Sequence, residues 1–223
     1  PKMLLAVGML VVIIAGGMDM TVGRLAGLGA VVSGTLAQQS TYYIKFWPSL
    51  PEMPLIVPII ASIIIGIISG VITGLIISKL KVPAFLAGLG LQLIIYGGNL
   101  LFMKKAPNNS QPLAGFKESF TKFGTGSVAG VNYLIIVAFV VMIAVYIILN
   151  MTTLGKNIYA TGGNREAAKV AGINVFKIDM FVYILSGALA ALAGCMLAAR
   201  TGSANATYAE GYEMDAIASC IIG

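Results

Sequence analysis

The sequence contains no histidine, only two cysteines and a single tryptophan, and 10% of its 223 residues are charged. The absence of histidine excludes His-based catalytic triads, histidine metal sites and histidine proton switches. The two cysteines, Cys195 and Cys220, lie far apart in apolar stretches, whereas zinc sites and disulfide frameworks need a denser, patterned set. We therefore interpret both as packing residues, and we expect neither a metal site nor a cofactor.

Charged residues of either sign are few, with 14 Lys and Arg against 8 Asp and Glu. No Lys/Arg cluster with interleaved aromatics occurs, so we do not expect nucleic acid as a partner. The phosphate-binding pattern GxxxxGK[ST] is absent too, which argues against nucleotide binding by this chain.

Apolar residues, by contrast, dominate: 58% of the chain is hydrophobic and the mean hydropathy is +0.95. A helix needs about 20 apolar residues to cross a bilayer. The apolar runs are too long and uniform for the strands of an outer-membrane barrel. We predict an all-α, polytopic transmembrane helical bundle, a single domain over 1–223. Because the chain begins without Met and stops in an apolar run, we expect a fragment truncated at one or both ends. The predicted spans are 3–15, 23–38, 55–78, 83–103, 132–150 and 179–199, with another starting near 216.

Small residues recur every four positions in the third predicted span, at Ser62, Gly66, Gly70, Gly74 and Ser78. Small residues at this spacing allow two helix backbones to approach closely in lipid. We therefore expect Gly66, Gly70 and Gly74 to pack against another helix.

The polar stretches between the spans suggest an orientation. Segment 104–131 reads as a long loop with at most short structure, and 38–54 carries the aromatics of an interfacial anchor. Placing 78–82 and 151–178 in the cytoplasm together with Arg24 gives seven basic residues on each side. Four of the outer seven lie in the longest loop, so we favour this orientation, although charge alone does not settle it.

The stretch "TGGNREAAKVAGIN", 161–174, interrupts the apolar sequence with a short polar helix pattern. Gly162 and Gly163 break the preceding structure, Asn164 is a good N-cap, Glu166 lies in the first turn, and Gly172 can end the helix. An ordinary connecting helix is the simpler interpretation. The alternative is a helix that docks in a groove of another protein.

Two further stretches carry acids beside apolar runs. In "AGGMDMTVGR", 15–24, Asp19 either faces a cavity beside a helix broken at Gly16 and Gly17, or caps the next helix at an interfacial turn. In "GSANATYAEGYEMDAIA", 202–218, three carboxylates precede an apolar run, which favours a capped helix start over acid/base catalysis. "GMDM" and "GYEMD" occupy similar places in the two halves, as in an inverted repeat.

Five ordered stretches together resemble the permeases of bacterial ABC importers for ribose, xylose, galactosides and related monosaccharides. They are "GGMDMTVGRLAGLGAVVSG", "VPAFLAGLGLQLIIYGG", "ATGGNREAAKVAGINV", "SGALAALAGCMLAAR" and "GSANATYAEGYEMDAIASCIIG". Branched-chain amino-acid permeases share the broader superfamily and are the nearest alternative. An Arg at position 24 is less usual in this family and is expected to alter the local turn.

The resemblance implies a coupling helix in a cytoplasmic loop, 151–178, that docks into a separate ATPase subunit, with Arg165 and Glu166 able to pair at the rim of the groove. It implies an extracytoplasmic sugar-binding protein at 104–131, and a second permease copy, identical or not, with the sugar path between the two. The coupling residues would be Gly162, Gly163, Asn164, Arg165, Glu166, Ala167, Ala168 and Gly172. Residues near the pathway or its gates would be Gly16, Gly17, Asp19, Gly23, Glu213 and Asp215.

We therefore expect a multi-pass permease of the bacterial cytoplasmic membrane that passes a monosaccharide and is not itself an enzyme. An ion-coupled secondary transporter remains an alternative; it would need an intramembrane charge, for which Asp19 is the only strong candidate. The sugar cannot be identified from the sequence.

Overall fold

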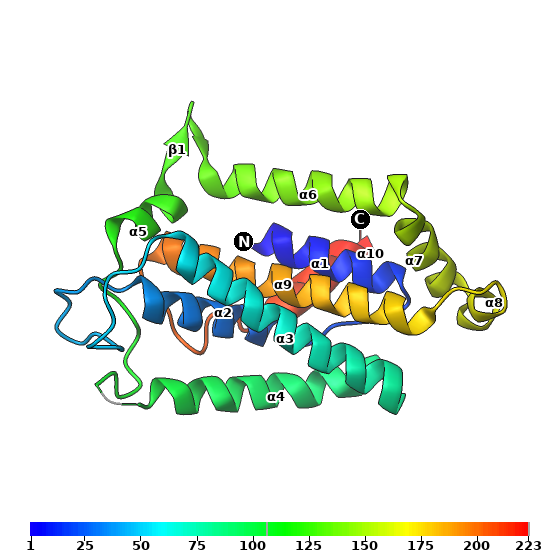
Figure 1. The fold of residues 1–223 in the computed structure, drawn as a ribbon, viewed down its shortest axis with the longest axis horizontal. Helices are drawn as coiled ribbons and strands as arrows, with labels where there is room; N and C mark the ends of the chain where they lie inside the picture. The colour runs from blue at the N-terminus through cyan, green and yellow to red at the C-terminus, as the bar shows by residue number, and fades with distance from the viewer. Residues whose placement is uncertain (106, 223) are drawn as a thin grey trace.

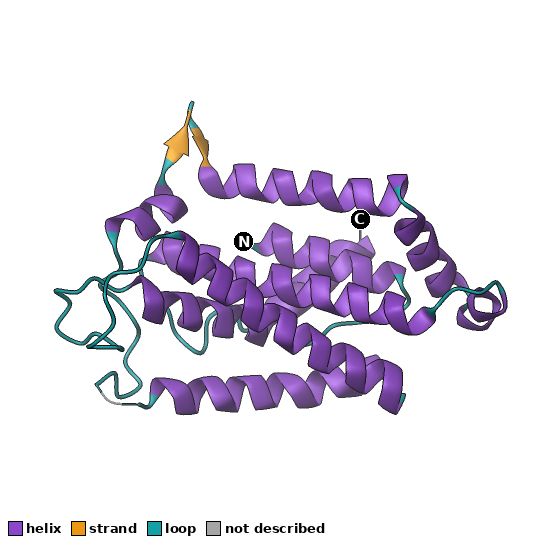
Figure 2. Cartoon of the chain, in the orientation of Figure 1, coloured by secondary structure: helices purple, strands orange, loops and turns teal. Residues whose placement is uncertain are grey.

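The computed structural model describes residues 1–105 and 107–222, and apart from one short hairpin the regular secondary structure of this part of the chain is helical (Figures 1 and 2). The all-α prediction is confirmed. The helices are α1 (Lys2–Ile14), α2 (Val22–Ala37), α3 (Ile56–Leu80), α4 (Ala84–Met103), α5 (Glu118–Thr125), α6 (Tyr133–Met151), α7 (Thr153–Gly163), α8 (Arg165–Val170), α9 (Val175–Thr201) and α10 (Tyr212–Ile222). A hairpin of β1 (Ser127–Val128) and β2 (Val131–Asn132) precedes α6.

In the described part of the chain, four helices are long and apolar enough to cross a membrane: α3, α4, α6 and α9. The span predicted over 23–38 is wrong in one respect. Its helix, α2, has 16 residues and is therefore only about 24 Å long, less than the hydrocarbon thickness of about 30 Å. The structure begins α2 well inside the bundle, because the preceding segment, 15–21, doubles back from the end of α1 (Figure 1).

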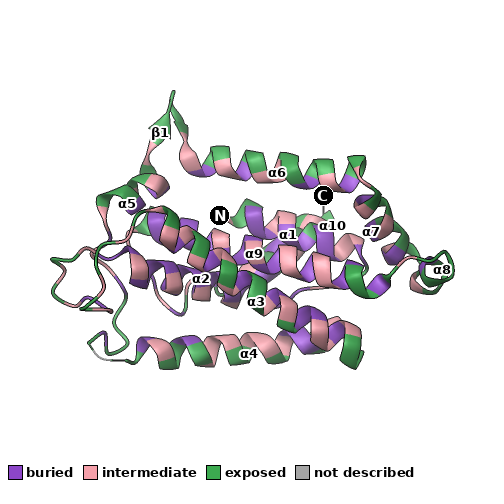
Figure 3. Ribbon diagram, viewed as in Figure 1, coloured by how far each residue is buried: buried purple, intermediate pink, exposed green. Residues whose placement is uncertain are grey.

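Helix α9 forms the centre of the bundle and has its most extensive contacts with α3, α2 and α1. In α9, 61% of the apolar segment is buried, against 22% in α4 and in α6. Figure 3 shows the same contrast, with buried residues along α9 and exposed ones along α6. The rest of the described chain therefore leaves most of the surface of α6 uncovered.

The small-residue stripe of α3 lies against α9. A Cβ on Gly66 would overlap the backbone carbonyl of Gly187, and a Cβ on Gly70 would overlap that of Tyr183. Gly74 differs, because a Cβ there would lie 2.9 Å from the sulfur of the flexible Met180 side chain. At Gly66 and Gly70 a larger residue would push the two helices apart, so the close approach depends on these two glycines.

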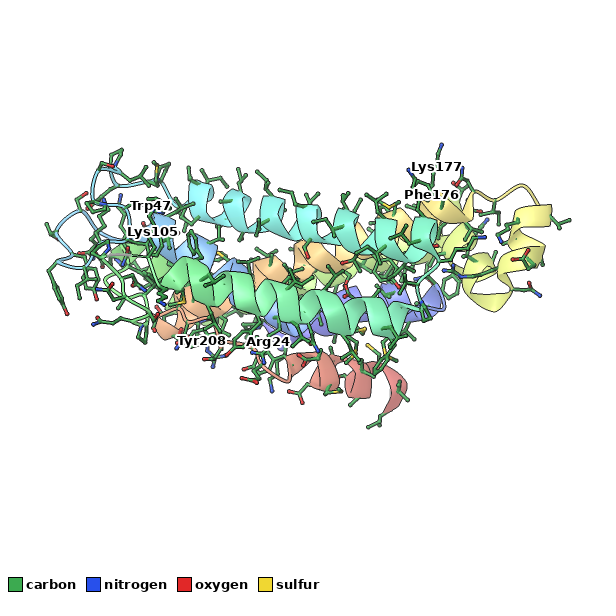
Figure 4. The ribbon with its side chains drawn as sticks, turned by 90° about the horizontal axis from the view of Figure 1, so that it is seen from below. Arg24, Trp47, Lys105, Phe176, Lys177 and Tyr208 are labelled. Carbon is green, nitrogen blue, oxygen red and sulfur yellow. The ribbon has the colours of Figure 1, made fainter. Side chains whose placement is uncertain are left out.

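The two ends of the bundle differ. Helices α7 and α8 lie at one end, and α5, the hairpin and the loop before α3 lie at the other (Figure 1). In Figure 4, Trp47 and Lys105 mark the second end, whereas Phe176 and Lys177 mark the first. The Lys105 ammonium lies 4.2 Å from the centroid of the Trp47 ring. Segments 161–174 and 104–131 therefore lie at opposite ends, as the expected orientation requires.

Candidate functional site

The segment 151–178 is more ordered than a loop, because α7 and α8 occupy most of it. Helix α7 was not anticipated; it begins where the Thr152 hydroxyl accepts a hydrogen bond of 3.2 Å from the Gly155 backbone N–H. Asn164 caps α8 as the sequence predicts, since its side-chain oxygen accepts hydrogen bonds of 3.0 Å from Glu166 N–H and Ala167 N–H. Gly172, at φ +83°, follows the end of α8.

Arg165 pairs with a residue of this chain, Asp179 of α9, while 41% of its side-chain surface stays exposed. Its guanidinium donates to both carboxylate oxygens of Asp179, at 2.5 and 3.1 Å. Asp179 lies in the first turns of α9, its side chain is only 2% exposed, and it also accepts a 2.9 Å hydrogen bond from Ser78 of α3. Sequence reasoning missed Asp179, whose partners are distant in sequence. This network fastens α8 to α9 and α3.

Glu166 pairs within α8 instead, with the Lys169 ammonium 2.6 Å from its carboxylate. The hydrogen bond from Lys169 holds the pKa of Glu166 below its ordinary value. Glu166 therefore stays ionised at neutral pH. Its side chain is 80% exposed, so the charge faces water at the tip of α8.

The predicted coupling and pathway residues meet at the end of α1. A Cβ on Gly162 would overlap the carbonyl oxygen of Ile14, and one on Gly16, whose φ is +79°, would lie 3.5 Å from the Cα of Gly162. A Cβ on Gly17 would lie 2.5 Å from the hydroxyl oxygen of Tyr183. A cavity of about 540 Å³ opens beside this contact. Its lining includes Gly16, Gly17, Lys81, Arg165, Lys169 and Tyr183.

Asp19 holds the turn that leads into α2, but the prediction that it caps this helix is wrong, because Thr21 occupies the N-cap position and no side-chain hydrogen bond caps the helix. It accepts hydrogen bonds from the N–H and hydroxyl of Thr21, at 3.0 and 2.6 Å, and from the hydroxyl of Ser186 on α9, at 2.8 Å. Its exposed fraction is 1%. Asp19 therefore anchors the re-entrant turn and does not line the cavity of about 540 Å³.

The remaining pathway candidates separate into two places. Glu213, in the first turn of α10, is 9% exposed and packs against Gly23 in the first turn of α2. Asp215 instead faces outward, where it binds Lys2 at 2.7 Å with both side chains more than half exposed. The structure thus brings Gly23 and Glu213 together and leaves Asp215 aside.

Arg24 follows Gly23 on α2 and contacts the segment just before α10. Its guanidinium binds Glu210 at 2.6 Å and lies over the ring of Tyr96, 4.1 Å from the centroid. Counting Arg24 among the basic residues of the cytoplasmic side was wrong, because the first turn of α2 lies well inside the bundle (Figure 1).

The two acidic stretches have matching topology. After α1 the chain doubles back and starts α2 inside the bundle, and after α9 it doubles back and starts α10 (Figure 1). Helix α2 packs along α9, and α10 packs along α1. From this start, α2 runs toward the α5 end and α10 toward the α7 end. This is the arrangement that an inverted repeat of "GMDM" and "GYEMD" predicts.

Comparison with known proteins agrees with this architecture. The family model for "Branched-chain amino acid transport system / permease component" matches residues 1–223. The galactose/methyl galactoside import permease protein MglC of Escherichia coli (strain K12) is 38% identical over 100% of this chain and 67% of its own length. The ribose import permease protein RbsC of the same strain is 36% identical over 99% of this chain and 64% of its own. No solved structure matches. The chain is an integral membrane protein and belongs to the family of permease components of branched-chain amino acid transport systems.

Proposed function

We propose that this chain is the permease subunit of an ABC importer that passes a monosaccharide across the bacterial inner membrane. The import permeases of galactose and ribose to which it is similar support a sugar, and they match nearly its whole length. The family description also covers branched-chain amino acids, which makes such a substrate the second candidate. In either case ATP is hydrolysed by a separate subunit, and this chain is not an enzyme.

The coupling role rests on one observation, the contact of Gly162 with the turn that follows α1. Helix α8 lies at one end of the bundle with Glu166 exposed, where it is open to a partner (Figure 1). Its base is held to α9 by the ion pair between Arg165 and Asp179. A push on α8 would therefore reach α9 through that pair and the re-entrant turn through Gly162. An ATPase subunit that grips α8 would move both.

The alternative of an ion-coupled secondary transporter depended mainly on Asp19, and the surroundings of Asp19 do not support it. A coupling ion needs free carboxylate oxygens in a cavity. The oxygens of Asp19 are already engaged by Thr21 and Ser186, and the side chain is buried. An importer with an external energy source needs no ion at this position.

The contact at Gly162 can be tested in the whole importer, reconstituted with its ATPase, binding protein and second permease copy. We expect Gly162→Val to lower uptake of labelled galactose or ribose about tenfold or more, because the side chain displaces α7 from the turn. Gly90→Val on α4 is the matched control, since Gly90 is exposed and nothing lies within 4 Å of a Cβ there. Equal uptake by both variants would remove the proposed route. If the wild-type importer takes up labelled leucine and no sugar, its substrate is a branched-chain amino acid.

Docking of the ATPase is tested separately through Glu166. The Glu118–Lys122 pair of α5, 2.8 Å long and also exposed, is its counterpart at the opposite end. We expect Glu166→Lys to reduce co-purification of the ATPase and its stimulation by sugar-loaded binding protein. Glu118→Lys should leave co-purification unchanged. If Glu166→Lys binds the ATPase as the wild type does, α8 is an ordinary connecting helix.

A further inference from the structure

Buried polar atoms without a hydrogen-bond partner are confined to three side chains in the described part of the structure. They are Nη1 of Arg24, Oε2 of Glu213, and both amide atoms of Asn99. Asn99 is 1% exposed and Glu213 is 9% exposed. Leaving such a group unpaired costs about 1–3 kcal/mol, and more for a charged group. Three of them in a bundle this apolar indicate that something else supplies their hydrogen bonds during function.

A series of contacts through α2 connects the helices that carry these three side chains. Glu213 packs against Gly23, and Arg24 is the next residue of α2. The Arg24 guanidinium lies over Tyr96. Asn99 follows Tyr96 by three residues on α4, so it shares that face of the helix. The unpaired groups therefore lie on α2 and on two helices that each contact α2, namely α4 and α10.

A cavity of about 320 Å³ adjoins this region through Glu210, which binds Arg24. Its lining also includes the hydroxyl side chains Thr201 and Thr207 and the aromatic rings of Tyr208 and Tyr212. The loop containing Tyr208 packs on α2, since a Cβ on Gly27 would lie 2.8 Å from the Tyr208 carbonyl. Figure 4 shows Arg24 and Tyr208 on the same side of the molecule.

The chemistry of this region suits a neutral, polyhydroxylated molecule. A sugar hydroxyl both donates and accepts, so it can satisfy a guanidinium N–H, a carboxylate oxygen and both atoms of an amide. Tyrosine rings offer apolar faces to the C–H groups of a sugar ring. The charge of Arg24 is already balanced by Glu210, and Glu213 adds a further acid, so an inorganic anion is disfavoured.

We propose that Arg24, Asn99 and Glu213, together with the Glu210 cavity, form a transient binding station for the transported sugar between α2, α4 and α10. This inference rests on the proposed function. Monosaccharide hydroxyls satisfy the unpaired groups as the sugar passes, and the station contributes to selectivity inside the permease. A second permease copy is the competing occupant of this face, and the experiment below separates the two.

Asn99→Leu is the sharpest test, because it removes the unpaired amide at nearly constant volume. Replacing an unsatisfied buried polar group by an apolar one is neutral or stabilising for folding. We therefore expect the Asn99→Leu importer to melt at an equal or higher temperature and yet to take up galactose or ribose about tenfold more slowly. Asn150→Leu is the control, because Asn150 is exposed on α6 and should leave uptake unchanged.

Glu213→Gln tests the second group in the same reconstituted importer, with singly deoxygenated sugars as probes. We expect the variant to lose discrimination between the parent sugar and at least one deoxy analogue. The station is overturned, and the proposed function is kept, if the wild-type importer transports sugar and both variants keep its uptake rate and its discrimination between sugars. A wild type that transports no sugar overturns the proposed function as well. Dissociation of the two permease copies in either variant assigns the groups to the subunit interface and also overturns the station.

Discussion

Glycine brings helices together at two places in this bundle, with different surroundings. Along the α3–α9 seam, formed by Gly66, Gly70 and Gly74 against α9, the first two glycines face backbone atoms of the partner helix. At the α2–α10 junction, formed by Gly23 and Arg24 against Glu210 and Glu213, Gly23 faces the end of the Glu213 side chain and the Ala209 carbonyl. A backbone cannot move aside without the helix, whereas a carboxylate can rotate. The same residue type thus builds a rigid seam and an adjustable junction.

Polar groups follow the same division. Asp179, at the end of the seam next to α8, has both carboxylate oxygens bonded to Arg165 and also accepts a hydrogen bond from Ser78. At the junction, Arg24 and Glu213 each keep one buried atom unpaired. Satisfied networks hold one arrangement, and unpaired groups favour a change of contacts. The seam is therefore suited to carry force and the junction to open.

The largest effect is expected at the seam. Gly70→Leu places a side chain where the Tyr183 carbonyl lies and forces α3 away from α9. Overpacking of this kind costs about 1–3 kcal/mol, and sometimes more. We expect a large loss of folded protein, measured as the monodisperse fraction in detergent. Gly98→Leu on the exposed face of α4 is the control, because nothing lies within 4 Å of a Cβ there. Equal yields of the two variants would mean that the seam is not a rigid contact.

An intermediate effect is expected from Gly23→Ala at the junction. The added methyl group displaces the Glu213 carboxylate and presses on the Ala209 carbonyl, 2.8 Å from the new Cβ. We expect the protein to fold in nearly normal yield and sugar uptake by the complete importer to fall severalfold, because α2 and α10 no longer close together. Gly70→Ala, prepared in parallel, should lose more folded protein. If Gly23→Ala loses as much as Gly70→Ala, the junction is as rigid as the seam and the comparison fails.

The smallest effect is expected from Ser186→Ala, which removes one of three hydrogen bonds to Asp19. Hydrogen bonds between helices within membranes contribute about 0.6 kcal/mol on average and at most about 1.7 kcal/mol. We expect a small decrease in melting temperature and nearly normal uptake. A loss of folded protein comparable to that of Gly70→Leu would show that Asp19 holds the re-entrant turn by itself, which would make this turn part of the rigid core.

Local patterns in the sequence predicted the helices well. The apolar runs located α3, α4, α6 and α9 within a few residues, and the glycine spacing of α3 identified the face that packs on α9. Asn164 was recognisable as a cap because capping acts over three residues. Helix α7 was missed because its moderately polar sequence reads as part of a loop.

The family, the all-helical class and the packing face of α3 were determined by the sequence itself, since they depend on composition and on spacings of three or four residues. The tertiary structure alone decided that Arg165 reaches Asp179, that Gly162 presses on the turn after α1, and that Arg24 lies between Glu210 and Tyr96. Each of these contacts joins different segments of the chain. Their distances depend on how α2 and α10 double back into the bundle, and no local periodicity records that path.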